Sequence, residues 1–133
     1  LNIGGYKYDK KTRTFPIFIN YDKQENISDT TKYEDHFISS DRLIAISKSG
    51  RSIDSEDVQN FLKAKERGID VQLFVRKNKD DKISKEFYYF GRVVATGAVK
   101  QFVMPNTDKT AVEIEWLLET PVREDIYEYI VNN

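Results

Sequence analysis

The sequence predicts an α+β fold in which a mixed sheet either curves strongly or closes into a small β-barrel, with one main helix and a short C-terminal helix. Runs of β-branched and aromatic residues are separated by polar turns, whereas one long stretch has the spacing of an amphipathic helix. Five to seven strands with one principal helix imply a sheet that curls around its own core. The 133 residues lie near the commonest single-domain size, so we expect residues 1–133 to form one domain.

The first strand is predicted over residues 14–23, "TFPIFINYDK", because its apolar residues alternate as they do in a half-buried strand. These residues are Phe15, Ile17, Ile19 and Tyr21. Residues 24–32 are polar and rich in turn-forming residues, which predicts a loop. The short apolar run 42–47, "RLIAIS", is bounded by polar clusters and predicts a second strand.

The main helix is predicted over residues 55–67, where apolar residues follow the i, i+3, i+4 spacing. These apolar residues are Val58, Phe61 and Leu62. Asp54 is the expected N-cap, because acidic side chains follow it in the first turn. Gly68 follows basic residues and is the expected C-terminal stop.

Three further β-type runs lie at residues 69–77, 86–104 and 110–120. The middle run is too long for one straight strand, so we expect a bulge or bend at Gly91 and at Gly97. Residues 123–133 follow Pro121 with helical spacing and predict the short C-terminal helix. The predicted core residues are Phe61, Leu62, Phe74, Val93, Ile114 and Trp116.

Composition limits the possible partners and compartments. The formal net charge of −1 supplies no general basic field, so an anionic partner would have to meet a local patch. The absence of cysteine excludes disulfides and thiolate chemistry and fits a reducing compartment. Neither a membrane-spanning stretch nor a signal sequence is present, so we expect a cytoplasmic protein with no membrane partner. Because the chain begins at Leu1, we expect it to be excised from a longer protein.

Residues for catalysis are scarce. His36 is the only histidine, so a zinc site or a His-based triad would lack partners, and no glycine-rich phosphate loop is present. Glu113 and Glu115 share one face of a predicted strand and could hold a divalent ion in a metal-dependent nuclease. They also fit the solvent face of a strand that buries its other side. We therefore predict no enzyme activity, no metal and no cofactor.

The segment 42–53 carries three cations and no carboxylate, which gives it a local charge of +3. The cations are Arg42, Lys48 and Arg51. The hydroxyls of Ser47 and Ser52, and backbone amides around a glycine, suit phosphate oxygens, and the segment leads into a predicted helix N-terminus. The segment is therefore a candidate phosphate-binding loop. The alternative is a solvated connection between a strand and a helix capped by Asp54.

Aromatic residues in the predicted strands are candidates for stacking on bases. Tyr33 lies beside the acidic Glu34 and Asp35, and the adjacent Tyr88 and Tyr89 must point in opposite directions within a strand. Bases stack on exposed rings, and carboxylates accept hydrogen bonds from base amino groups. Core packing is the alternative role of the tyrosines.

The order of several segments resembles that of domain-of-unknown-function family 3427, an uncharacterised C-terminal domain of bacterial DEAD/DEAH-box (superfamily two) helicases that also carry phospholipase-D-like nuclease domains. The segments are "FPIFINY", "YEDHFIS", "SKSGRS" with "SEDV", "VQLFVRK", "FYYFGRV" and "AVEIEWLLETPV", and together they span Thr14 to Tyr129. An aromatic residue often precedes the serine-rich turn in that family, whereas this chain has "LIAIS" there.

This resemblance implies a helicase and nuclease machine, with restriction-modification or anti-phage defence as its setting, in which the terminal domain binds DNA. A small α+β domain with a curled sheet is also similar to PUA-like and SRA-like folds, some of which read modified bases by flipping them into a pocket. The partners so implied are DNA, duplex or single-stranded, and the helicase and nuclease domains of the same parent chain.

We predict a non-catalytic, DNA-binding accessory domain. On the fold analogy, this prediction includes the reading of a modified base. The alternatives are a module that docks on the neighbouring helicase or nuclease domain, and a metal-dependent nuclease. The predicted phosphate contacts are Arg42, Ser47, Lys48, Arg51, Ser52, Arg76 and Lys77. The predicted base contacts or pocket residues are Tyr33, Glu34, Asp35, Tyr88 and Tyr89. Convergence of the cations on one concave face would favour DNA over docking.

Overall fold

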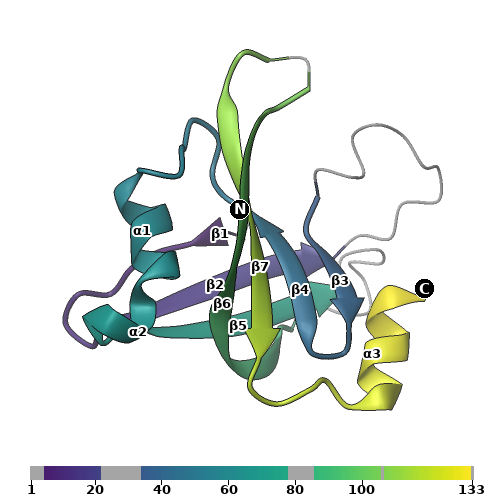
Figure 1. Cartoon of the computed structure of the whole chain (residues 1–133). Helices are drawn as coiled ribbons and strands as arrows, with labels where there is room; N and C mark the ends of the chain where they lie inside the picture. Colours follow the sequence, from purple (N-terminus) through teal and green to yellow (C-terminus); the bar gives the residue numbers. More distant parts are fainter. Residues whose placement is uncertain (1–4, 22–33, 78–85, 106, 133) are drawn as a thin grey trace.

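The computed structural model describes residues 5–21, 34–77, 86–105 and 107–132 (Figure 1). These residues form seven strands and three helices. The strands are β1 (Gly5–Tyr6), β2 (Thr14–Tyr21), β3 (His36–Ser39), β4 (Arg42–Ile46), β5 (Asp70–Lys77), β6 (Tyr88–Val103) and β7 (Thr110–Leu118). The helices are α1 (Glu56–Leu62), α2 (Ala64–Arg67) and α3 (Glu124–Val131).

The strands form one mixed, curved sheet in the order β1-β2-β5-β6-β7-β4-β3. The β2–β5 pair is parallel, and the other pairs are antiparallel. Both β1 and β3 are edge strands, so the sheet is open. This arrangement confirms the predicted curved mixed sheet in preference to a closed barrel. Helices α1 and α2 lie toward one side of the sheet and α3 lies beside β3 (Figure 1).

The long strand β6 produces much of the curvature. Its first part pairs with β5, and its part from Val93 onward pairs with β7. Register shifts occur near Gly91 and between Ala95 and Val99, and Gly91 and Gly97 have φ values of 83° and 102°. An L side chain rarely adopts such angles, so glycine permits both irregularities. The predicted bends at these two glycines are confirmed.

Two tyrosine hydroxyls connect strands at opposite ends of the sheet. The Tyr6 hydroxyl in β1 accepts a hydrogen bond of 3.0 Å from the backbone N–H of Lys48, which follows β4. The Tyr21 hydroxyl at the end of β2 accepts one of 3.2 Å from the N–H of Phe37 in β3. The open sheet is therefore drawn together by side chains and not by a backbone ladder.

The core occupies one face of this sheet. Strand β2 buries alternate residues, and β5 and β7 do the same, as half-buried strands should. Helix α1 adds Val58 and Phe61 to the core, and α3 adds Ile130. The ring of Phe61 meets that of Trp116 edge to face at 5.2 Å.

The predicted core set is correct except at two positions. Phe61, Val93, Ile114 and Trp116 are buried. Leu62 is half-buried against the cluster. Phe74 lies on the opposite face, because the buried positions of β5 are the odd-numbered residues, and its ring stacks on Phe18 at 4.9 Å.

The main helix differs from its prediction. It is interrupted at Lys63, whose φ and ψ are −109° and 21°, so the predicted span 55–67 contains the separate helices α1 and α2. Ser55, not Asp54, occupies the N-cap position. Gly68 ends α2 in the left-handed conformation, with φ of 66°, as predicted.

The other predicted strands and the C-terminal helix are present, with ends shifted by a few residues. Strands β1 and β3 were not predicted, because each is short and adjoins polar sequence. The predicted loop 24–32 lies outside the described residues. Of the helices in the described part of the chain, none has the length and apolarity needed to cross a membrane.

Replacing Trp116 by alanine should lower the free energy of unfolding by about 3–5 kcal/mol, because the buried indole would leave a cavity beside Phe61. Urea unfolding followed by circular dichroism measures the change. Val103→Ala is the matched control, since that side chain is 58% exposed in the neighbouring strand and should change stability by less than about 0.5 kcal/mol. Equal stability of Trp116→Ala and the native chain would contradict this assignment of the core.

Candidate nucleic-acid interface

A hollow of about 550 Å³ lies between the N-terminal residues 6–10 and the segment 48–57. We call it the basic hollow and define it by Tyr6, Lys7, Tyr8, Lys10, Phe15, Lys48, Gly50, Arg51, Ser55, Glu56, Asp57 and Asn60. Four cations and two carboxylates line it, so its lining has a net charge of +2 in a chain of net charge −1. Two segments that are distant in sequence thus build a local basic site.

The segment 47–51 is held against the start of β7 by hydrogen bonds in both directions. Ser47 donates its N–H to the carbonyl of Val112 at 2.8 Å, and the N–H of Val112 donates to Ser47 Oγ at 2.9 Å. Gly50 donates to the carbonyl of Thr110 at 2.7 Å, and Thr110 Oγ1 donates to the carbonyl of Arg51 at 2.8 Å. Since these bonds already order the segment, a ligand would not have to supply that order.

Tyr6 is a buried residue in the lining of the basic hollow. Its hydroxyl donates to Asp57 Oδ2 at 2.6 Å while it accepts the N–H of Lys48. The ammonium of Lys48 lies 4.7 Å from the centroid of the Tyr6 ring, within the range of a cation–π contact. Burial and the hydrogen bond to Asp57 raise the pKa of Tyr6, so the phenol stays protonated and donates.

Asp57 holds Arg51 in the hollow, with Arg51 Nε 2.9 Å from Asp57 Oδ2. Burial acts to raise the pKa of Asp57, but hydrogen bonds from Tyr6 and Arg51 outweigh it and lower that pKa below its usual value. The carboxylate is therefore charged at neutral pH. It orients the guanidinium and offsets one of the four positive charges.

Two of the predicted phosphate contacts, Lys48 and Arg51, line the basic hollow. Ser47 is buried, and its hydroxyl donates to the carbonyl of Lys48 while accepting from Val112, so it offers no donor to a phosphate. Ser47 is therefore not a candidate phosphate contact. Ser52 does not line the hollow, and its backbone N–H donates to Ser55 Oγ at 2.9 Å.

The expected contribution of the helix N-terminus also needs correction. Helix α1 has only seven residues, and Glu56 and Asp57 occupy its first turn. These carboxylates compete with any anion at that end, so we assign the candidate site to side-chain cations.

The other predicted phosphate contacts lie away from the hollow. Arg42 pairs with Glu115 across β4 and β7 at 3.2 Å. Arg76 donates from Nε to Asn20 at 2.8 Å and lies over the Phe87 ring. Lys77 is buried, and its ammonium donates to the carbonyl of Tyr129. The structure does not bring these residues together with Lys48 and Arg51.

The predicted base-stacking residues do not share one surface. Tyr33 lies outside the described residues. Tyr88 is on the side of β6 that carries Phe90, with the two rings 6.1 Å apart. Tyr89, which is 57% exposed, contacts the ring of Phe74 at 5.1 Å. The two adjacent tyrosines therefore point to opposite faces of the sheet.

Asp35 is half-buried and lines a small cavity. Glu34 is also half-buried, and its backbone carbonyl lies 2.9 Å from Nδ1 of His36. Asp35 Oδ1 accepts the N–H of Ile46 at 2.7 Å. Burial raises the pKa of Asp35 to about 6, and the Ile46 hydrogen bond opposes that rise. The cavity holds about 30 Å³, close to the volume of one water and far below that of a base.

The nuclease alternative depends on clustered carboxylates. Among the described residues there is no group of three His, Cys, Asp or Glu side chains that could hold a metal ion. Glu113 and Glu115 are half-buried on one face of β7. Glu115 accepts hydrogen bonds from Arg42 and Thr96, so this carboxylate serves a structural network.

Four residues that shape the hollow were not predicted from the sequence: Tyr6, Lys7, Lys10 and Asp57. The run "KYDKK" at residues 7–11 contains three lysines and was a usable signal of positive charge. Its position opposite Lys48 depends on the curvature of the sheet, which the local sequence pattern does not specify.

Comparisons with known proteins agree with the fold. The model of a family described as "Domain of unknown function (DUF3427)" matches residues 1–130. No curated protein matches the chain. The solved SRA domain of SUVH5, described in complex with fully methylated CG DNA, is similar with a TM-score of 0.52 and 12% sequence identity. The likeness covers 89% of this chain and 76% of that chain, and it supports an SRA-like fold.

Tyr6→Phe should lower the free energy of unfolding by about 1–2 kcal/mol, because Lys48 N–H and Asp57 would each be deprived of a partly buried partner. It should also raise the pKa of Asp57, which an NMR titration of the carboxyl carbon measures. Tyr8→Phe is the control, since the Tyr8 ring packs on Phe15 and its hydroxyl makes no hydrogen bond within the described residues. An unchanged Asp57 titration in Tyr6→Phe would contradict the proposed organisation of the hollow.

The raised pKa of Asp35 predicts that the free energy of unfolding depends on pH. Its pKa is about 6 in the folded chain against an ordinary value of 3.8, so its stabilising contribution is complete below about pH 3.8 and disappears as pH rises through 6. Asp35→Asn imitates the protonated acid. The variant should match the native chain near pH 4 and exceed its unfolding free energy at pH 7 by up to about 3 kcal/mol. Urea unfolding between about pH 4 and 7.5 measures this, and a constant difference would contradict it.

Proposed function

This chain belongs to the DUF3427 family, and we propose that it is a DNA-binding domain that contributes binding and not catalysis. The observation that carries the proposal is the convergence of Lys7, Lys10, Lys48 and Arg51 on one hollow. A similar fold in the SUVH5 SRA domain, described with fully methylated CG DNA, also supports it.

The chemistry of the hollow suits the phosphates of a nucleic-acid backbone. Lys7, Lys10 and Lys48 are exposed and make no ion pair within the described residues, so their ammonium groups can meet phosphate oxygens. Arg51 uses Nε for Asp57, and its two terminal nitrogens are further donors of the kind that phosphates accept. Counterion release on phosphate contact would then supply most of the affinity.

We also propose a parent protein for the domain and a role in reading modified bases. Following the family resemblance, we place the domain in a cytoplasmic helicase and nuclease protein of restriction or anti-phage defence, with those domains as its intramolecular partners. Recognition of a modified base rests on the SRA-like fold. The cavity beside Asp35 has room for one water, so a flipped base would enter there only if the surrounding strands separated.

Neutralising Lys7, Lys10 and Lys48 together to glutamine should weaken DNA binding and reduce the slope of log affinity against log salt by about 0.9 for each duplex phosphate that the variant no longer neutralises. None of the three makes an ion pair within the described residues, so the fold should persist. Fluorescence anisotropy of a labelled duplex of about 20 base pairs, measured from low to physiological salt, gives both quantities.

The control is the glutamine triple of Lys63, Lys65 and Lys100, which changes net charge equally but does not line the basic hollow. The measurement is repeated with an unmethylated duplex, a methylated duplex and a single strand of the same sequence, to test which form of DNA the chain prefers. Equal reductions of affinity and slope in the two triples would contradict the assignment to this hollow, as would no binding of any arm by the native chain.

A further inference from the structure

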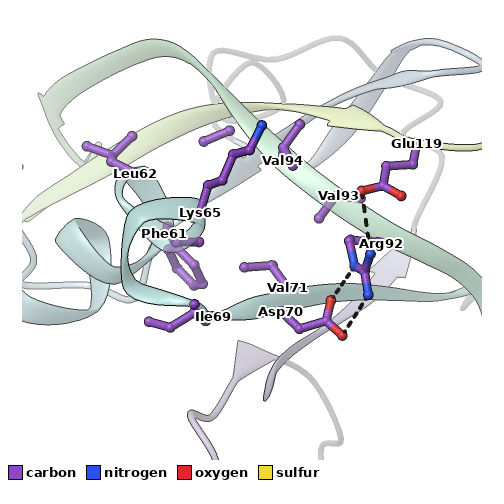
Figure 2. Close-up of a pocket in the computed structure, with 13 residues that line it drawn as sticks. Phe61, Leu62, Lys65, Ile69, Asp70, Val71, Arg92, Val93, Val94 and Glu119 are labelled. Carbon is purple, nitrogen blue, oxygen red and sulfur yellow. Dashed lines mark hydrogen bonds and ion pairs between the residues drawn. The ribbon is translucent and has the colours of Figure 1, made fainter. Parts of the chain in front are cut away.

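A second cavity of about 550 Å³ lies on the other side of α1, between α2 and strands β5 and β6 (Figure 2). We call it the apolar pocket. Its lining includes the buried side chains of Phe61, Ile69, Val71 and Val93, together with the partly exposed Val94. Ligand sites in proteins are commonly concave, mostly apolar and of about 300–1,000 Å³. The pocket has the size and surface of such a site.

One end of the apolar pocket carries a charge network in which Arg92 faces two carboxylates, those of Asp70 and Glu119. Arg92 Nε donates to Asp70 Oδ1 at 2.8 Å, and Arg92 Nη1 lies 4.0 Å from Glu119 (Figure 2). The hydrogen bond from Arg92 lowers the pKa of Asp70, and Gln72 donates a further bond of 2.9 Å to Asp70. Because Asp70 already has these partners, its carboxylate is satisfied without an added cation.

Lys65 provides a different charge at the side of the pocket formed by α2. Its side chain is exposed at the pocket, apart from the Arg92 network (Figure 2). Within the described residues its ammonium makes no ion pair and no hydrogen bond to another side chain. An anionic group placed beside Lys65 would therefore gain a partner without breaking an existing contact.

We propose that the apolar pocket binds a small apolar ligand that carries one anionic group. Its apolar part would lie against the accessible side chains of Leu62, Ala64 and Val94, above the buried Val71 and Val93, and its anion beside Lys65. Burial of the ligand's own apolar surface supplies most of the affinity, and the lysine fixes its orientation. The basic hollow and the apolar pocket share no lining residue. This site is therefore independent of the proposed DNA contacts.

Two dyes with similar ring systems separate the apolar and ionic contributions. 8-Anilinonaphthalene-1-sulfonate carries an anion, and N-phenyl-1-naphthylamine is its uncharged analogue. Both should bind the native chain saturably, as measured by fluorescence enhancement. Lys65→Gln should weaken the sulfonate dye about two- to fivefold, as expected for one exposed ion pair, and leave the neutral dye unchanged. Val94→Trp should fill the mouth and abolish both.

Lys63→Gln is the matched charge control, because Lys63 lies at the break between α1 and α2 but does not line the pocket. Urea unfolding of each variant excludes dye binding to a loosened core, and NMR shifts of Val71 and Val93 methyl groups place the dye. The proposal is overturned if neither dye saturates, if Val94→Trp retains binding, or if Lys63→Gln and Lys65→Gln weaken the sulfonate dye equally.

Discussion

The linkage of unpaired strands by two tyrosine hydroxyls is the constraint on which the rest of this structure depends. Backbone pairing ends at β1 and at β3, yet Tyr6 accepts a bond from Lys48 and Tyr21 accepts one from Phe37. A phenol reaches farther than a backbone amide, so these bonds can span strands that do not pair. The curled sheet can then enclose one core without the register that a closed barrel requires.

The bends of β6 make this approach of the edges possible. A straight strand of sixteen residues would carry β5 and β7 in one flat layer, whereas Gly91 and Gly97 allow β6 to leave one neighbour and join the other. The same turning lets Trp116 of β7 meet Phe61 of α1 in the core. Curvature and core packing therefore support each other.

The basic hollow follows from this geometry. Tyr6 comes from the first strand, Lys48 and Arg51 follow the fourth, and Asp57 lies in the first turn of α1, but one network of hydrogen bonds joins them. Helix α1 has the hollow on one side and the apolar pocket on the other, so a short amphipathic element separates two different environments. The proposed nucleic-acid face and the proposed ligand pocket can thus coexist in a small domain.

The sequence by itself determined the periodic features of this protein. Alternation at Phe15, Ile17 and Ile19 predicted a half-buried strand, and glycines at 91 and 97 predicted the bends, because side-chain direction and φ are local properties. The cation-rich loop at 48–51 was also visible as a pattern of charge.

Only the tertiary structure decided which of these residues meet. It placed Phe74 outside the core, buried Ser47 and Lys77, and brought Lys7 and Lys10 to the same hollow as Lys48. The physical reason is that burial and convergence depend on strand order and register across the whole sheet, which contacts between distant segments select and no local spacing contains.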